Sequence, residues 1–331
     1  MENAIIISNK KTPTIRVTKQ THWLANKRPI AAADKGLLQK AVKQRRPKSK
    51  NYEDSWGYVI QATRNNGFKW YDRQNKALIF FGRKKSSDSR LVVPTFFAEP
   101  KYLAQVLDTL QKELKTTKTI IKNVNVEEIT TFLPYGFRAY KDNESWDSFA
   151  RFDDQTYPQQ VINLDSLALH KGGPYKNLRT ALHKNPALSI RKYSSDDKEK
   201  VLDLFALKDG NTPDSKDKTM GMYYTSHALY ASADVDKYVI CDKTTGGIIG
   251  FTATSNISPK TAAYVASIFK PGIKVASVWG IFHTLLIKHQ EKYKYMNLGG
   301  CETEGTYNFM RRTFQPEEKI KKTHLVYDPS K

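Results

Sequence analysis

Two amphipathic helical patterns, each placed between predicted strands, constrain the fold of this chain more than any other feature. The first pattern opens at Pro100 and repeats leucines on one face, among them Leu103 and Leu107. The second pattern covers Val278–His289 with the same spacing. A helix that joins two strands of one sheet is a crossover, so the strands on either side of each helix should run parallel.

Short apolar stretches before each helix predict antiparallel meanders that are separated by polar turns. In the first half the predicted strands are Trp56–Gln61, Lys76–Phe81 and Ser89–Phe97, with Thr119–Val124 after the helix. In the second half they are Lys237–Cys241, Ile248–Thr254 and Thr261–Phe269, with Tyr295–Leu298 after the helix. In addition, Ser194 and Asp197 are spaced as a capping pair for a helix over Ser195–Lys208.

The two halves share one order of elements, and this predicts an α/β (α+β) fold. Each half would form a mixed sheet with an antiparallel meander, a crossover helix and a parallel strand pair, which is similar to a GNAT domain of the acetyltransferase type. Two copies in tandem fit the length of 331 residues. We expect a basic, partly flexible N-terminal extension over 1–53, a first GNAT-like domain over 54–165, and a second over 166–331 that carries the active site.

The charge of the chain is strongly positive and unevenly distributed. Lys and Arg number 54 against 33 Asp and Glu, which gives a net charge of +21. Residues 1–50 hold 13 of these cations and only two acids, and the run 40–50 has too few apolar positions to fold by itself. A polyanion such as nucleic acid is the partner that this pattern favours, because each neutralised phosphate releases counterions. A solvated basic face and an anionic membrane surface are the alternatives.

Cations and aromatic side chains in and after this segment are the candidates for nucleic-acid contact, since flat rings stack on bases. They are Lys40, Lys43, Arg45, Arg46, Lys48, Lys50, Trp70, Arg83, Lys84 and Lys85.

Other classes of protein are disfavoured by composition. Apolar residues make up 39% of the chain, which excludes wholesale disorder, yet there is no run of 18 apolar residues that would predict a membrane span. Cys241 and Cys301 are too few for a disulfide framework or a four-thiolate zinc site, and the seven histidines show no metal-binding spacing. We expect a cytoplasmic protein without a metal or a tightly bound cofactor, and the sequence leaves its oligomeric state open.

Three short motifs of the second half resemble a known family. Residues Gly172–Lys184 resemble the "G-K-Y-x-x-x-R" helix of the phosphatidylglycerol lysyltransferase C-terminal-domain family. Residues Tyr295–Gly305 and Asn308–Phe314 are similar to its closing strand, glycine turn and "F-K-x-x-F" helix, and Fem-type aminoacyltransferases end similarly. The likeness covers about residues 90–327. It implies a tandem GNAT fold that transfers an aminoacyl or acyl group to an amine or hydroxyl, often from aminoacyl-tRNA.

The chain also departs from these families. Met310-Arg311 replaces the usual phenylalanine-lysine pair, and no multi-span hydrophobic region precedes the domains. The loop that holds coenzyme A in ordinary GNAT enzymes is missing, and Phe269–Ser277 stands in its place. The donor, a co-substrate, is therefore left open among aminoacyl-tRNA, an adenylate and acyl-CoA.

Cations, glycines and helix ends in the second half are candidates for binding the donor and its phosphates. A helix N-terminus with nearby fixed charges suits an anion, glycines allow close approach, and arginine grips a carboxylate or phosphate through two bonds. The alternative for each is a solvated helix face or turn. The candidates are Lys171, Lys176, Arg179, Lys270, Lys274, Ser277, Gly299, Gly300, Arg311 and Arg312.

The turn after the last parallel strand holds the candidate catalytic residues Asn297, Glu302 and Glu304. An attacking amine must be neutral to react, so either glutamate could accept its proton. The alternative role for the glutamates is to cap the helix that follows. We therefore expect a transferase with nucleic acid as donor or as acceptor. The second hypothesis is a non-catalytic nucleic-acid-binding protein on a GNAT scaffold, and the third is a lipid aminoacyltransferase at a membrane surface.

Overall fold

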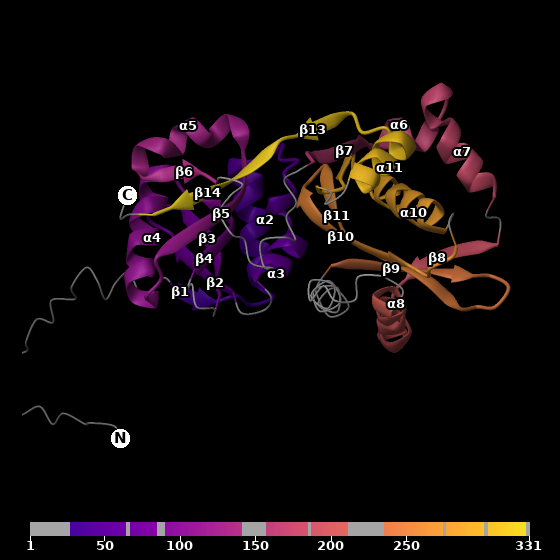
Figure 1. Ribbon diagram of the computed structural model, residues 1–331, viewed down its shortest axis with the longest axis horizontal. Coiled ribbons are helices and arrows are strands. Elements are labelled where there is room, and N and C mark those ends of the chain that lie inside the picture. The colour runs from indigo at the N-terminus through magenta and orange to yellow at the C-terminus, as the bar shows by residue number, and fades with distance from the viewer. Residues whose placement is uncertain are drawn as a thin grey trace, which may run out of the picture.

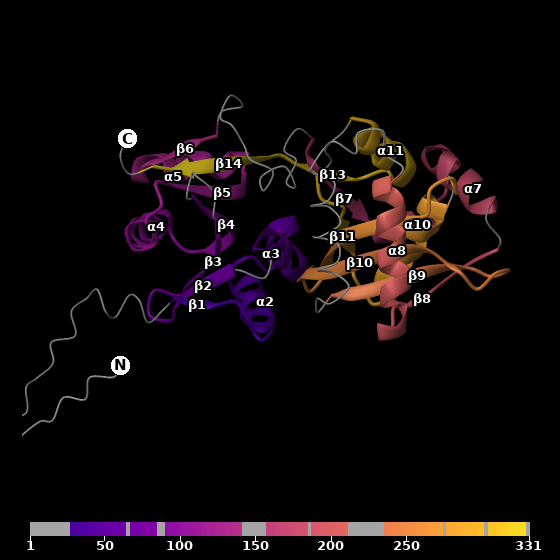
Figure 2. The ribbon, with the colours of Figure 1, turned by 60° about the horizontal axis from the view of Figure 1, so that its bottom comes forward.

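Both predicted crossovers are present in the computed structural model of this chain, which describes residues 27–63, 67–84, 90–140, 157–184, 187–210, 235–273, 276–300 and 304–328. Strands β4 and β5 pair in parallel from Arg90 opposite Lys118. Strands β11 and β12 pair in parallel from Thr261 opposite Tyr295. The described residues form two seven-stranded mixed sheets, with helices packed on each (Figure 1, Figure 2). The prediction of two GNAT-like halves is confirmed.

The first half runs from β1 to β6 and surrounds one sheet. Its elements are β1 (Lys27–Pro29), α2 (Asp34–Arg45), η1 (Tyr52–Asp54), α3 (Trp56–Thr63), β2 (Gly67–Asp72), β3 (Ala77–Lys84), β4 (Arg90–Phe97), α4 (Pro100–Leu114), β5 (Lys118–Asn125), η2 (Val126–Glu128), α5 (Ile129–Phe132), η3 (Leu133–Tyr135) and β6 (Phe137–Ala139).

The second half begins with β7. Its elements are β7 (Gln159–Asn163), α6 (Leu164–Leu169), η4 (Gly173–Tyr175), α7 (Lys176–His183), β8 (Leu188–Lys192), η5 (Ser195–Asp197), α8 (Lys198–Gly210), β9 (Asp236–Asp242), β10 (Ile248–Ser258), β11 (Thr261–Phe269), α10 (Ala276–Gln290), β12 (Tyr295–Asn297), α11 (Glu304–Phe314), β13 (Glu318–Ile320) and β14 (Lys322–Tyr327).

One strand of the second half is exchanged into the sheet of the first half. The strand order of the first sheet is β1-β2-β3-β4-β5-β14-β6, and that of the second is β13-β7-β12-β11-β10-β9-β8. The last strand of the chain, β14, therefore lies between β5 and β6, whereas β7 stays in the second sheet, between β12 and β13. Figure 1 shows the yellow strand β14 among the magenta strands of the first half. The first sheet is complete only with this strand from the end of the chain.

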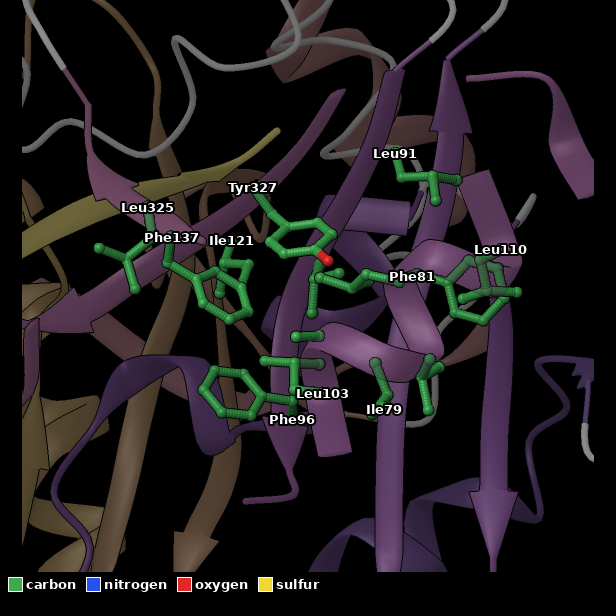
Figure 3. Close-up of a cluster of buried hydrophobic side chains, with 14 of the residues drawn as sticks. Ile79, Phe81, Leu91, Phe96, Leu103, Leu110, Ile121, Phe137, Leu325 and Tyr327 are labelled. Carbon is green, nitrogen blue, oxygen red and sulfur yellow. The ribbon is translucent and has the colours of Figure 1, made fainter. Parts of the chain in front are cut away.

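The exchanged strand β14 supplies side chains to the core of the first half. Leu325 and Tyr327 lie in the same buried cluster as Phe81, Leu103 and Phe137 (Figure 3). The α4 side chains of this cluster follow the predicted leucine stripe. Burial of these apolar surfaces couples the end of the chain to the first sheet, so the two halves should unfold together.

The predicted strand Trp56–Gln61 is wrong, because these residues belong to the helix α3. Trp56, Tyr58 and Val59 are all buried, and α3 packs against strands of both sheets. An apolar run that is buried on all sides has no periodicity that distinguishes a strand from a helix. The first strand of the meander is instead β2, which pairs with β1 and β3.

The basic segment before residue 54 contributes ordered elements to the first half. Strand β1 pairs with β2, and α2 buries Leu38 and Val42 against α3 and β3. Asp34 at the start of α2 is paired with Lys69 of β2. The boundary that we placed at residue 53 thus falls within the first half, and β7 belongs to the second sheet although it precedes the boundary at 166. Within the described residues, every helix is too short or too polar to traverse a bilayer.

Candidate functional site

In the first half the parallel strand pair separates partway along its length. Pairing between β4 and β5 stops after Val93 and Ile121. The next residue, Pro94, has no N–H to donate, so the ladder cannot continue through it. Both strands run on, to Phe97 and Asn125. The diverging strand ends leave a space between them, and side chains from other elements border this space.

A pocket that is open to solvent lies where β4 and β5 diverge. It is bordered by the segment that joins α2 to η1, by both strands and by β14. Its polar walls include Arg46, Glu53, Thr95, Lys122, Asn125 and Lys322. Four of these, Glu53, Thr95, Lys122 and Lys322, are polar side chains that are almost completely removed from solvent.

Glu53 is the buried carboxylate of this pocket and is only 4% exposed. Its Oε2 lies 3.1 Å from Nζ of Lys322, which also donates to Oδ1 of Asn51 at 2.9 Å. Gln159 of β7 donates to the other carboxylate oxygen. Burial raises the pKa of Glu53 above its ordinary value, although the positive charge of Lys322 acts in the opposite direction.

The other cations of the pocket are also held by the fold. Arg46 Nη1 donates to Oδ1 of the buried Asp54 at 2.8 Å, and its guanidinium lies 4.8 Å from the ring centre of Phe97. Lys122 is 3% exposed and stands next to His324. Burial and the charge of Lys122 hold the pKa of His324 well below its usual range, so this imidazole is neutral at pH 7.

A hydrogen-bond network leads from this pocket to the strand end of the second half. Gln159 Oε1 accepts from the backbone N–H of Tyr52 at 3.3 Å and from Nδ2 of Asn297 at 2.8 Å. Asn297 Nδ2 also donates to the carbonyl of Lys50 at 2.6 Å, and its Oδ1 accepts from the N–H of Gly299 at 2.7 Å. Asn297, predicted as catalytic, is fully buried, and its Nδ2 holds the segment before η1 while its Oδ1 closes the turn at Gly299.

Tyr52 occupies the position near Gly299 where the glycines predicted a ligand. Gly299 has φ +76°, and a Cβ on it would lie 3.4 Å from the ring of Tyr52. The hydroxyl of Tyr52 donates to the carbonyl of Val265 at 3.4 Å. The group that comes close to Gly299 is therefore the side chain of Tyr52, which belongs to the first half. Gly300 is exposed.

The predicted donor-binding residues fall into two groups at opposite ends of α7. At its start, Gln315 after α11 donates to the carbonyl of Pro174 at 3.0 Å, which brings α11 and η4 together. The exposed cations at this end are Lys171, Lys176, Arg311 and Arg312. Arg179 Nη1 donates to the carbonyls of His170 and Gly172, both at 2.8 Å, and so braces the preceding loop.

The second group lies at the start of α10. Lys270 is exposed, Ser277 is half-buried and Gly272 has φ +86°. Leu182 at the end of α7 packs near Trp279 at this end. The eight residues of α7, which span about 12 Å, lie between the two groups. Lys274 lies outside the described residues.

Of the two predicted bases, Glu304 lies within the described residues. Glu304 is the exposed first residue of α11, where its Oε1 accepts from Nδ2 of Asn308 at 3.3 Å. Glu302 lies outside the described residues. The position of Glu304 fits the capping role that was its alternative.

Four of the predicted nucleic-acid contacts remain exposed on α2 and the turn that follows it. None of the four forms an ion pair with another described residue. They are Lys40, Lys43, Arg45 and Lys48. Because α2 buries Leu38 and Val42 against the first half, Lys40 and Lys43 lie together on its opposite face, and Arg45 and Lys48 follow at its end.

The remaining predicted contacts are different. Trp70 is a correction, because its ring is fully buried in the core of the first half and cannot stack on a base. Lys50 is paired with Glu318 at 2.5 Å and lies 3.8 Å from the ring centre of Tyr295. Arg46 is engaged with Asp54, as described above. Arg83 and Lys84 end β3, and Lys85 lies outside the described residues.

Sequence reasoning missed the buried charged residues of this pocket. Glu53 follows a basic run and was assigned to an extension, and Lys122 lies within an apolar strand. The signal that could have found them is a charged residue inside an otherwise buried β-sequence, as at Lys122. Among the described residues, no three His, Cys, Asp or Glu side chains gather as a metal site would require.

Comparison with solved structures shows the same fold over nearly the whole chain. A conserved protein of unknown function from Bacteroides thetaiotaomicron VPI-5482 aligns with a TM-score of 0.67 and 15% identity, over 91% of this chain and 99% of that one. L-PGS from Bacillus licheniformis aligns with a TM-score of 0.59 and 12% identity, over 89% and 92%. FemX aligns with a TM-score of 0.59 and 10% identity, over 91% and 97%.

These similarities confirm, at the level of the fold, the resemblance that the sequence motifs indicated. No protein-family model matches this chain, and no curated protein matches it in sequence.

Proposed function

We propose that this protein is an acyl- or aminoacyltransferase that forms an amide or ester on an amine or hydroxyl acceptor. The observation that carries the proposal is the pocket at the divergence of β4 and β5. A concave polar site with a buried carboxylate of raised pKa and two buried lysines is typical of a catalytic or binding site. The fold shared with L-PGS and FemX supports the same class of reaction.

The catalytic contribution of such a site would be mainly positional. Holding a donor carbonyl against an acceptor nitrogen or oxygen replaces a bimolecular encounter, and fixed donors stabilise the developing oxyanion. A carboxylate is needed to receive a proton from an attacking amine. Glu302 and Glu304 stay candidates for this role beside the pocket carboxylate, and the exposed cations near α7 and α11 stay candidates for binding donor phosphates.

Nucleic acid is proposed as the donor, in the form of aminoacyl-tRNA, or as the acceptor. The support is the basic face of α2, whose exposed cations Lys40, Lys43 and Lys48 pair with no described acid. The helix ends at Arg45, and the next residue, Arg46, borders the pocket. A phosphate backbone that lies along α2 would therefore lead to the mouth of the pocket.

The second candidate function is a non-catalytic nucleic-acid-binding protein on the same scaffold. The observation that favours it is Tyr52, whose ring packs against Gly299 at the strand end where the sequence predicted a ligand. This candidate requires the basic face of α2 but no chemistry in the pocket.

Intact-mass analysis distinguishes the two functions. The full chain would be incubated with nucleic acid, with primary-amine acceptors and in turn with aminoacyl-tRNA, an aminoacyl adenylate and acyl-CoA. The transferase proposal expects the mass of one acyl or aminoacyl group on an acceptor. Binding without a mass change for every donor would support the second candidate.

The basic face is tested by the salt dependence of nucleic-acid binding. Replacing Lys40, Lys43 and Lys48 together by Gln should lower the slope of log K against log salt by about 2–3, since each neutralised phosphate contributes about 0.7–0.9. Replacing Lys198 and Lys200, two exposed cations of α8 that belong to no candidate site, by Gln serves as the control. An unchanged slope in the α2 variant would place the nucleic acid elsewhere.

A further inference from the structure

Two buried side-chain amides connect the end of β12 to the carboxylate of the pocket. Asn297 Nδ2 donates to Oε1 of Gln159 at 2.8 Å, and Gln159 Nε2 donates to Oε1 of Glu53. All three side chains are buried. We call Asn297 and Gln159 together the amide relay. Because a buried amide that turned around would leave its partners unpaired, each amide of the relay is held in one orientation.

Backbone groups set the orientation of Asn297. The N–H of Gly299, which can only donate, lies 2.7 Å from Oδ1 of Asn297. The carbonyl of Lys50, which can only accept, lies 2.6 Å from its Nδ2. A reversed amide would place an N–H against the N–H of Gly299 and an oxygen against the carbonyl of Lys50. Asn297 therefore directs an N–H, and not an oxygen, toward Gln159.

The orientation of Gln159 follows from that of Asn297. Its Oε1 faces two donors, Nδ2 of Asn297 and the backbone N–H of Tyr52 at 3.3 Å. The oxygen of this amide is thus committed to these two groups, and the nitrogen is the end that faces Glu53. Gln159 can act toward Glu53 only as a donor.

The second oxygen of Glu53 also faces a donor. Nζ of Lys322 lies 3.1 Å from Oε2, and an ammonium group can only donate. A neutral carboxyl group would have to turn its O–H toward Lys322 or toward Gln159, both of which already donate to it. Burial raises the pKa of Glu53, and these two donors act against burial by favouring the charged form.

We propose that Gln159 is a positioning residue of the transfer reaction, which holds Glu53 in its orientation and in its ionised form, and that Asn297 fixes the direction of the Gln159 amide. The inference rests on the proposed transferase function, in which a carboxylate receives a proton. It goes further because it makes the pocket of the first half depend on two uncharged side chains of the second sheet.

The relay acts by hydrogen bonding and not by charge. The charged groups that act on Glu53 are Lys322 of β14 and Asp54 of η1. The other charged side chains that border the pocket are Arg46, Lys122 and Glu128. A hydrogen bond to a charged group has a free energy that corresponds to about 1–2 pH units in the titration of that group. This is the shift that removal of the Gln159 donor should produce.

Gln160, the next residue of β7, offers a matched control. It is the same type of residue on the same strand and is also fully buried. Its Nε2 donates to the carbonyl of Tyr307 at 3.1 Å. Successive side chains of a strand point to opposite faces, so Gln160 stabilises the strand without contacting Glu53.

Titration of the Glu53 carboxyl carbon by ¹³C NMR tests the relay without any substrate. The full chain would carry glutamate labelled at the side-chain carboxyl carbon. Glu53→Gln identifies the Glu53 resonance, and Glu127→Gln, an exposed neighbour, removes a different one. Gln159→Met keeps the length of the side chain without an N–H and should raise the titration midpoint of Glu53 by about 1–2 pH units. Gln160→Met should leave it unchanged. An unchanged midpoint in Gln159→Met would overturn the proposal.

Asn297→Asp tests the direction of the relay. It keeps an acceptor for the N–H of Gly299 but replaces the amide donor by an oxygen, so the amide of Gln159 is drawn to turn its N–H away from Glu53. The new charge also raises the midpoint directly, and this part remains in the Gln159→Met background. The relay predicts a larger shift from Asn297→Asp in wild-type protein than in Gln159→Met. Equal shifts in both backgrounds would mean that Asn297 does not act through Gln159.

The pH profile of the reaction tests the consequence for transfer. With any donor that wild-type protein accepts, Gln159→Met should move the acid limb of kcat/KM to higher pH by the same amount as the NMR midpoint. Gln160→Met should keep the limb of wild-type protein, although both variants lose a buried amide. A merely structural role of Gln159 would lower stability and leave the limb in place. Circular dichroism would confirm folding, and Gln159→Leu decides the matter if Gln159→Met does not fold.

The outcomes separate this inference from the proposed function. If wild-type protein transfers no group from any donor, the transferase function fails, and the NMR titration still decides whether the relay controls Glu53. If product forms and the NMR midpoint moves in Gln159→Met while the acid limb does not, Gln159 is not a positioning residue of the reaction, and the function stands with another base.

Discussion

The role of Asn297 gives the most detailed prediction, because sequence and structure assign it differently. The sequence placed Asn297 among the catalytic residues, whereas the structure buries it completely and uses its amide in three hydrogen bonds. Two of these bonds hold the segment before η1, through the carbonyl of Lys50 and the side chain of Gln159. The third closes the turn at Gly299. We predict that Asn297 acts on stability and on the position of η1.

The size of the effect follows from the contacts. Replacing Asn297 by Leu keeps most of the volume and removes all three hydrogen bonds. Each such bond contributes about 1 kcal/mol, so the loss in the free energy of unfolding should be about 3 kcal/mol. The carbonyl of Lys50 and the N–H of Gly299 would also lose a partner, which makes this figure a lower bound.

Urea denaturation followed by tryptophan fluorescence measures the change. The midpoint should fall for Asn297→Leu while the slope of the free energy against urea concentration stays constant. Asn308→Ala is the control, because Asn308 is only half-buried on α11 and makes a single long side-chain hydrogen bond, to Glu304, so its loss should change stability by less than about 0.5 kcal/mol. Gln159→Leu, combined with Asn297→Leu in a double-mutant cycle, should show a coupling of about 0.5–3 kcal/mol.

Two results would refute this reasoning. One is a loss of stability below about 1 kcal/mol in Asn297→Leu, which would mean that the three hydrogen bonds do not hold the segment. The other is a variant with wild-type stability that has lost transfer activity, which would return Asn297 to a catalytic role.

Two further predictions concern other parts of the molecule. The pKa of His324 is low in the folded protein, so below about pH 6.5 this side chain is protonated in the unfolded chain but not in the folded one. Wild-type protein should therefore lose stability relative to His324→Gln by up to about 1.4 kcal/mol per pH unit as the pH falls. Parallel curves of stability against pH for the two proteins would contradict this. Gly280→Ala would place a Cβ 2.6 Å from the ring of Phe269 and should lower the free energy of unfolding, measured by heat or urea, by about 1–3 kcal/mol. Adding Phe269→Leu should restore part of this stability. If the double variant shows no recovery, the strain lies elsewhere.

Local sequence signals predicted the elements that depend on nearby residues. The leucine stripe of α4 and the strand-helix-strand order around α4 and α10 led directly to the two parallel strand pairs. Ser194 and Asp197 form the predicted capping box at the start of η5. These features involve residues a few positions apart, and their spacing is set by helix geometry alone.

The crossing of β14 into the first sheet could not be predicted in the same way. A strand such as Lys322–Tyr327 has the same local sequence pattern whether it completes the sheet of its own half or that of the other half. What decides is the shape of both halves after folding, when β5 and β6 leave a place between them that accepts β14. Likewise, α3 is apolar throughout because it is packed between the two sheets.

The candidate site was missed for the same physical reason. Its pocket joins Glu53 to Lys122 and to Lys322, which are distant in the sequence and are brought together by the divergence of β4 and β5 and by the exchanged strand β14. The basic face of α2 was predicted because a run of exposed cations can be identified from the sequence alone. A buried ion pair such as that of Glu53 and Lys322 is evident only when both elements are in place.

The initial rate at which the full chain consumes an aminoacyl ester, measured against the concentration of a primary amine, tests the central claim most directly. The account predicts a rate that rises with amine concentration and saturates, with amide as the product, and that falls by at least 10² in Glu53→Gln but not in Glu127→Gln. A rate that is independent of the amine, or equal in wild-type protein and Glu53→Gln, would contradict it.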